Sequence, residues 1–121
     1  MLYVSPFTFS GAGTLVRLGE KIFKATDKKD IDRAARGVLT AAGFGEAFFH
    51  RTGHGLGLSL HEEPYLVEGN TLPLAAGMVF SDEPGVYFPD RFGIRIEDTV
   101  LCTETGGRRL NEATRALTVM S

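Results

Sequence analysis

"MVFSDEPGVYFPDRFGIRIEDTVLCT", residues 78–103, is the stretch that decides the fold class of this 121-residue chain. Its β-branched and aromatic residues alternate with polar ones, and the turn formers of "FPDRFG" (88–93) interrupt them. Alternation broken by turn residues is typical of antiparallel strands joined by hairpins. A second predicted turn, "TETGGR" (103–108), leads to a further strand region, "RRLNEATRALTVM" (108–120). Residues 46–121 are therefore predicted to be β-rich.

The residues before this part follow a helical period instead. From residue 31 the apolar positions fall at i, i+3, i+4, i+7, i+8 and i+11, occupied by Ile31, Ala34, Ala35, Val38, Leu39 and Ala42. A shorter set between residues 14 and 25 consists of Leu15, Leu18, Ile22 and Phe23. Asp27 is a predicted N-cap, and Gly43 a predicted stop. The sequence thus predicts helices over 14–42 packed on a curved antiparallel sheet, an α+β domain.

Composition limits the class of protein to which the chain can belong. With 43 % hydrophobic and 23 % charged residues, it suits one soluble domain with a modest core. A net charge of −2 argues against nucleic acid as a partner, because such proteins usually carry a concentrated basic excess. No apolar run approaches the roughly 20 residues of a membrane helix. The single cysteine, Cys102, cannot form an internal disulfide, so a cytoplasmic location is expected.

All three histidines lie in "FFHRTGHGLGLSLHEEP", residues 48–64. Alternating glycines around His54 disfavour a helix and permit a close approach of backbones. His50, His54 and His61 are therefore predicted on a bent strand or strand-loop. Two interpretations stay open from these residues alone, because a histidine at a strand end is either an ordinary polar residue or a ligand.

Charged residues also stand on the predicted strands. The period of two places Arg95, Glu97 and Thr99 on one face, and Glu83 precedes a Pro-Gly break. A buried Arg and Glu must be paired or bind something, whereas an Arg95–Glu97 pair on an edge strand would be a surface feature. His54 with Glu83 and Glu97 can converge on a divalent cation such as Mn, Co, Fe or Zn, which accept mixed imidazole and carboxylate ligands.

Three ordered blocks carry a resemblance to a known family. They are "HRTGHGLGLSLHEEPYLVEGN" (50–70), "LAAGMVFSDEPGVYFPDRFGIRIEDTVL" (74–101) and "TGGRRLNE" (105–112). The chain resembles the C-terminal half of the catalytic domain of pita-bread-fold peptidases, the Xaa-Pro dipeptidases (prolidases) and Xaa-Pro aminopeptidases. The match runs from about Asp30 to near the C-terminus. Residues 1–13 match nothing in the family, and residues 14–121 are expected to form part of a pita-bread domain.

The resemblance implies a role for each site residue. The family holds two divalent metals, which implies Mn, Co or Zn as cofactors and Xaa-Pro peptides as substrates. His54 resembles a metal ligand, Glu83 a ligand that also handles the proton of the attacking water, and Glu97 the carboxylate that bridges both metals. His61 resembles a histidine that hydrogen-bonds the substrate, and His50 one that the proline-specific branch places ahead of the metal histidine. Arg95 resembles an arginine that orients a carboxylate or holds a substrate group.

The chain also departs from the family pattern. Two further metal ligands, a pair of aspartates on a hairpin upstream of the helix, have no counterpart in these 121 residues. Asp27, Asp30 and Asp32 lie at a helix start, where capping and dipole interactions account for them, and Asp82 stands where a more apolar residue is expected. A truncated enzyme that is inactive alone is therefore the favoured interpretation.

Two other interpretations compete with it. One is a non-catalytic pita-bread relative that binds peptides or a protein. The other is a split enzyme, completed by a second copy or by a separate N-terminal segment. The absence of the upstream hairpin would leave sheet edges and a core face uncovered, which predicts a homo-oligomer or association with that segment.

Overall fold

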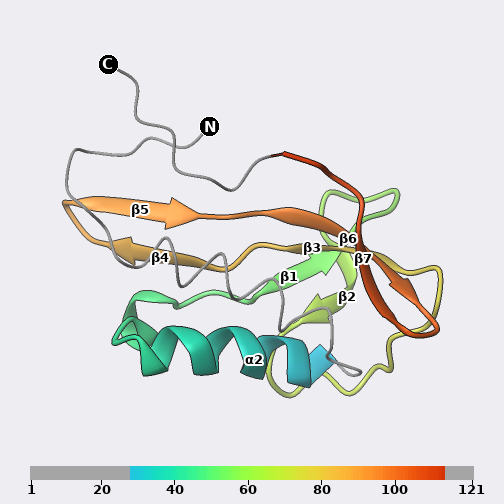
Figure 1. The fold of residues 1–121 in the computed structure, drawn as a ribbon, viewed down its shortest axis with the longest axis horizontal. Helices are drawn as coiled ribbons and strands as arrows, with labels where there is room; N and C mark the ends of the chain where they lie inside the picture. Colours follow the sequence, from blue (N-terminus) through green and yellow to red (C-terminus); the bar gives the residue numbers. More distant parts are fainter. Residues whose placement is uncertain (1–27, 114–121) are drawn as a thin grey trace.

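The computed structural model of the chain describes residues 28–113 (Figure 1). Helix α2 spans Lys28–Ala41 and is followed by a short 3₁₀ helix, η1, at Gly45–Ala47. The seven strands are β1 (Gly53–Gly55), β2 (Glu62–Leu66), β3 (Val79–Asp82), β4 (Gly85–Phe88), β5 (Phe92–Arg95), β6 (Asp98–Thr103) and β7 (Gly106–Arg109). The predictions for residues 1–27, including the Asp27 cap, and for residues 114–121 lie outside the described residues.

Antiparallel pairing organises the strands into two sheets. Five strands follow the order β2-β1-β3-β6-β7, and β4 pairs with β5 in a separate ribbon. In Figure 1, β3 runs on toward β4 and β5 runs on into β6, so the four strands form one long hairpin with a break. The Ile96 amide donates to the Pro84 carbonyl across this break (3.3 Å). Glu83 and Glu97 therefore both lie at the interruption, on opposite strands.

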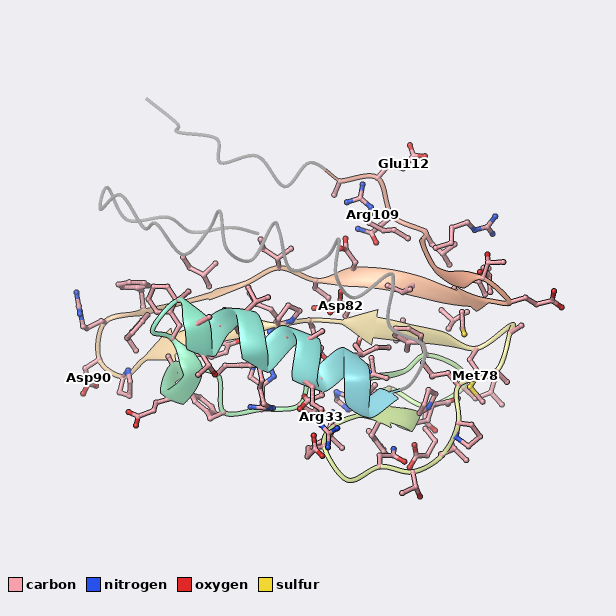
Figure 2. The ribbon with its side chains drawn as sticks, turned by 60° about the horizontal axis from the view of Figure 1, so that its bottom comes forward. Arg33, Met78, Asp82, Asp90, Arg109 and Glu112 are labelled. Atoms are coloured by element: carbon pink, nitrogen blue, oxygen red, sulfur yellow. The ribbon has the colours of Figure 1, made fainter. Side chains whose placement is uncertain are left out.

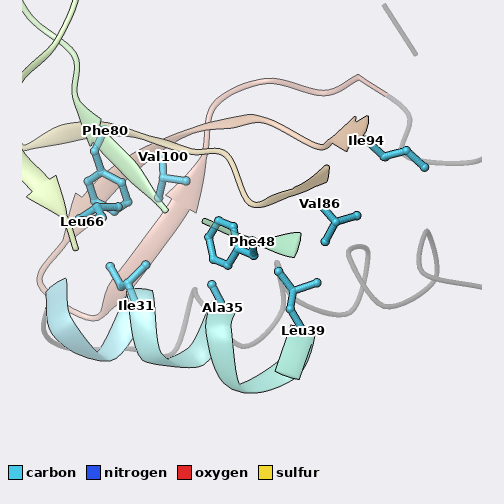
Figure 3. Close-up of a cluster of buried hydrophobic side chains, with 9 residues drawn as sticks. All are labelled: Ile31, Ala35, Leu39, Phe48, Leu66, Phe80, Val86, Ile94 and Val100. Atoms are coloured by element: carbon cyan, nitrogen blue, oxygen red, sulfur yellow. The ribbon is translucent and has the colours of Figure 1, made fainter. Parts of the chain in front are cut away.

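Helix α2 packs against the sheet through the predicted apolar stripe, which confirms the predicted architecture. The buried core consists of Ile31, Ala35, Leu39, Phe48, Leu66, Phe80, Val86, Ile94 and Val100 (Figure 3). Across the described residues, the helices fall short of the length and apolar content that crossing a membrane requires.

The C-terminus of α2 is set by a glycine. Gly43 has φ +83°, its amide donates to Thr40 (3.0 Å), and the Phe44 amide donates to Leu39 (2.8 Å). These two bonds are the Schellman pattern, so the predicted stop at Gly43 is confirmed. Because the helix ends at Ala41, Ala42 is exposed, and its predicted place on the buried stripe is wrong.

The hairpin turns are largely as predicted. Asp90 lies at the tip between β4 and β5 with φ +59° (Figure 2). The predicted turn over 103–108 joins β6 to β7 but is shorter, since β7 already begins at Gly106. Gly107 pairs with Cys102, which draws the end of the predicted turn into the sheet.

Candidate active site

His54 lies on β1, between β2 and β3, and is 6 % exposed. Its flanking glycines let the three backbones approach closely. A Cβ at Gly53 would overlap the Ser81 carbonyl oxygen, and one at Gly55 would overlap that of Glu63. The backbone amide of His54 donates to Ser81 Oγ (3.0 Å). The glycine alternation therefore reflects close strand packing, and it confirms the bent strand predicted for this histidine.

The His54 ring is oriented by its own strand. Nδ1 lies 3.0 Å from the Gly55 carbonyl oxygen. Because a carbonyl only accepts hydrogen bonds, Nδ1 is the donor in this contact. Nε2 then faces Glu83 Oε1 at 3.2 Å. A lone pair and a carboxylate oxygen in this arrangement require a cation between them, either a proton on Nε2 or a metal ion.

Glu83 is a buried carboxylate of the site, and it is 8 % exposed. Its Oε1 accepts from Ser81 Oγ (3.1 Å), so the two side chains lie on the same face of the chain. Its Oε2 accepts from Arg95 Nη1 (2.7 Å). The buried negative charge is thus compensated by a guanidinium on the facing strand, as a buried charge requires.

Arg95 connects Glu83 to an aromatic residue that the sequence analysis did not single out. Its Nε donates to Tyr87 Oη at 2.7 Å. This hydrogen bond, together with the negative charges of Glu83 and Glu97, raises the pKa of Arg95 above its ordinary value, although partial burial opposes the shift. The ion pair joins Arg95 to Glu83, so the alternative of an Arg95–Glu97 surface pair is not what the structure shows.

Tyr87 could have been found from its pairing partner. It lies opposite Gly93 in the β4–β5 ribbon, and a Cβ at Gly93 would overlap its ring. A glycine facing an aromatic residue across a hairpin leaves room for the ring to lie over the strand. The sequence contains that signal in "GVYFPDRFG", residues 85–93.

The two other histidines flank the pair of His54 and Glu83. The His61 ring is exposed and contacts the His54 ring, with centroids 4.4 Å apart. His50 is half-buried, and its Nδ1 donates to the Arg51 carbonyl (2.7 Å). Its ring meets that of Tyr87 at 5.4 Å. His50 Nε2 is buried and has no hydrogen-bond partner among residues 28–113, so it can receive an outside group.

A cavity of about 810 Å3 joins four of the six predicted site residues. It is lined by His50, His61, Glu83 and Arg95, and further by Arg51, Glu63, Tyr65, Val67, Glu68, Gly69 and Asn70. His54 is the fifth residue, and it contacts this set through Glu83 and His61. The sixth, Glu97, is exposed at the break in the hairpin, close enough for its charge to act on Arg95.

The pair of His54 and Glu83 fits a divalent ion in spacing and chemistry. Two ligands of one ion, each bound at about 2.1 Å, lie roughly 3.0 to 3.4 Å apart, and Nε2 and Oε1 are separated by 3.2 Å. Imidazole with carboxylate suits several first-row metals. Within the described part of the chain, no three His, Cys, Asp or Glu side chains are grouped closely enough to hold a metal. The role of Glu97 as a bridging ligand therefore stays a prediction.

The role predicted for Asp32 at the start of the helix is wrong. It is fully buried, accepts two hydrogen bonds from Arg36 (2.7 and 3.2 Å), and accepts one from Thr52 Oγ1 (2.8 Å). Capping and dipole interactions are therefore not the reason for this carboxylate, which joins α2 to the strand that carries His54. The unexpected Asp82 is 3 % exposed, so it occupies the core-facing position at which an apolar residue was expected.

Comparisons with known proteins identify the family to which the chain is similar. The sequence pattern of metallopeptidase family M24 matches residues 15–104. A probable dipeptidase PepE of Mycobacterium tuberculosis is 52 % identical over 101 residues, 84 % of this chain and 27 % of that protein. A Xaa-Pro dipeptidase of Lactobacillus helveticus is 44 % identical over 92 residues, 76 % of this chain and 25 % of its own length.

A solved structure extends the similarity to three dimensions. The crystal structure of dipeptidase PepE from Mycobacterium ulcerans superposes with a TM-score of 0.86 at 48 % identity, over 95 % of this chain and 32 % of that one. The chain thus spans about a quarter of the length of its curated relatives. The predicted resemblance and the partial pita-bread fold are confirmed, and the chain belongs to metallopeptidase family M24.

Proposed function

We propose that the chain carries the histidine and glutamate part of a dinuclear metal site that hydrolyses Xaa-Pro dipeptides or N-terminal Xaa-Pro bonds. The observation that carries this proposal is the buried Glu83 carboxylate, which lies between Arg95 and His54 at a cavity containing His50 and His61. The Xaa-Pro dipeptidase among the relatives supports the substrate class.

In this proposal each of the six site residues has a distinct role. His54 Nε2, Glu83 and Glu97 would hold divalent ions, with Mn, Co or Zn as candidates. The chemistry that such ions supply when bound is acidification of a water and stabilisation of the oxyanion. Glu83 takes the proton of the attacking water, and Arg95 keeps that carboxylate oriented. His61 hydrogen-bonds the substrate from the cavity wall, and His50, whose Nδ1 donates to the Arg51 carbonyl, offers Nε2 as a hydrogen-bond acceptor.

We further propose that the 121-residue chain is inactive by itself. Three ligands of the five that the resemblance implies have counterparts here, and an aspartate pair would have to come from another segment or a second copy. We also propose a cytoplasmic location, because a single free cysteine stays reduced in a reducing compartment.

Metal binding and turnover test this proposal separately. Purified chain with Mn2+ or Co2+ and Ala-Pro is expected to release essentially no proline, yet to bind Co2+ detectably by calorimetry. His54→Ala should abolish that binding, whereas His61→Ala, the matched histidine control, should retain it. Proline release by the chain alone that Glu97→Ala abolishes would overturn the inactivity. Co2+ binding that survives His54→Ala would overturn the metal site.

A non-catalytic peptide-binding role is the second candidate. The buried, unpartnered His50 Nε2 beside an open cavity favours it. Titration with Ala-Pro in the absence of metal distinguishes the two functions. Binding that His54→Ala leaves unchanged supports the binding role. Activity that appears on mixing with an aspartate-bearing N-terminal segment of a relative supports the peptidase.

A further inference from the structure

A buried polar network outside the cavity ties helix α2 to the site. Arg36 donates to both carboxylate oxygens of Asp32, and Thr52 Oγ1 donates to the same carboxylate. Asp32 and Thr52 are both fully buried. Burying the Asp32 carboxylate costs desolvation energy that an apolar side chain at this position would avoid, and Arg36, which is partly exposed, compensates its charge. The network lies next to the site, so we look for a role in the site in addition to a role in stability.

Arg36 fixes the segment that leads to the histidines. Its Nη1 donates to the Phe48 carbonyl (2.9 Å), and its Nη2 donates to the His50 carbonyl (2.7 Å). The guanidinium also lies over the Phe48 ring, 4.5 Å from its centroid. One side chain of α2 thus holds the backbone on both sides of residue 49, and with it the position of His50 beside Tyr87.

Thr52 relates the two proposed metal ligands to each other. It lies two residues before His54, and its carbonyl accepts the Glu83 amide at 2.7 Å. Its own amide donates to the Leu66 carbonyl at the end of β2 (3.0 Å). A displacement of Thr52 would therefore shift His54 through the chain and Glu83 through the hydrogen bond to its amide, and would change the contact between their side chains.

We infer that Asp32, Arg36 and Thr52 form a positioning network for the active site, which sets the distance between His54 and Glu83 and the place of His50. None of the three lines the cavity, so they act through other residues. This inference rests on the proposed function in one respect only, namely that the positioned residues His54 and Glu83 bind a metal ion. Mutation of such outer partners of metal ligands typically weakens metal affinity by about 10- to 100-fold.

Thr52→Val tests the inference, because it removes one hydroxyl and keeps the shape of the side chain. Co2+ affinity measured by calorimetry is expected to fall by about 10- to 100-fold, and the Glu83 amide and His54 ring resonances are expected to move. Thr52→Ser, which restores the hydroxyl, should return both readouts toward the unaltered chain. Asp32→Asn should act in the same direction as Thr52→Val.

Val38→Ala is the matched control on the same helix, since Val38 packs partly against the core. It should lower the melting temperature while leaving Co2+ affinity and the two sets of resonances in place. If Thr52→Val lowers only the melting temperature, the network is merely structural and the inference is overturned. If the unaltered chain binds no Co2+, the proposed function fails, and the Glu83 and His54 resonances still decide the positioning role.

Discussion

The Glu83 carboxylate receives a hydroxyl, a guanidinium and an imidazole from three different strands. Because the carboxylate is buried, its negative charge is stabilised by these three neighbours more than by water. Arg95 is the only one of the three that carries a permanent positive charge. Loss of this one side chain would leave a buried carboxylate without its cation.

Arg95→Gln should therefore destabilise the folded chain by about 1–3 kcal/mol, less than for a fully buried pair because Arg95 is partly exposed. Urea denaturation measures the difference. The control is Arg91→Gln near the hairpin tip, where the guanidinium lies over Phe92 and is exposed. A change within about 0.5 kcal/mol is expected there. Equal effects of the two substitutions would contradict the role assigned to the ion pair.

The stability that Arg95 contributes should not depend on pH in the neutral range. Its folded-state pKa is raised above its ordinary value, chiefly by the hydrogen bond to Tyr87. A raised pKa gives stability that is fully present below the unfolded-state pKa and is lost only as pH rises through the folded-state value. The difference between the unaltered chain and Arg95→Gln should thus be constant between about pH 6 and pH 9. Denaturation curves across this range would reveal a slope if the assignment were wrong.

Single residues were predictable where their chemistry is unusual. His54, Glu83 and Arg95 stood out in the sequence as a histidine among glycines and as charges on apolar strands, and the structure brings them together. Asp32 was misread because its partner Thr52 lies 20 residues away. An Asp and an Arg four positions apart resemble an ordinary surface pair on a helix, and nothing local signals that the carboxylate is buried.

Among the elements, β1 depends on its glycines most directly. It lies between two strands so close that no Cβ fits at residue 53 or 55. The tight approach brings His54 next to Ser81 and Glu83. The same glycines therefore serve both the sheet and the site.

Gly53→Ala should destabilise the fold by more than about 3 kcal/mol, since backbone atoms on the neighbouring strand must move. Gly37→Ala is the matched control, because residue 37 is exposed within α2 and nothing lies within 4 Å of the added Cβ. It should instead stabilise the chain by about 1 kcal/mol. Thermal unfolding followed by circular dichroism measures both changes. A stable Gly53→Ala protein would refute the packing explanation.

Element boundaries were predictable only in part. Period-two alternation across residues 92–103 continues in the burial pattern, yet the strand is interrupted between Arg95 and Asp98. The cause is Pro84 on the facing strand, which lacks an amide for the ladder. A break imposed by a partner strand leaves no mark in the sequence of the strand that it interrupts.

At the scale of the whole molecule, an apolar loop between β1 and β2 is the most exposed hydrophobic feature of the described residues. Leu58 and Leu60 are 107 % and 82 % exposed. Exposed apolar side chains gathered in one loop favour contact with another protein surface. The loop ends at His61, so a partner bound there would border the cavity.

We predict that the chain self-associates through this loop, so replacing Leu58 and Leu60 together by Ser should lower the association. Sedimentation velocity over a range of concentrations measures this as a shift toward the monomer. Leu72→Ser is the control, because Leu72 is 42 % exposed and lies outside this loop. Unchanged association in the double variant would exclude the loop as the contact surface.

The interrupted hairpin has a consequence for the order in which the chain folds. Phe88 pairs with Phe92 across a short turn, whereas β1 reaches β3 only through contacts far apart in sequence. Local hairpins close in microseconds, and long-range pairings must first overcome the entropy of loop closure. We expect Glu83 and Glu97 to be brought opposite each other in this early step. His54 would then reach a pair of carboxylates that is already assembled.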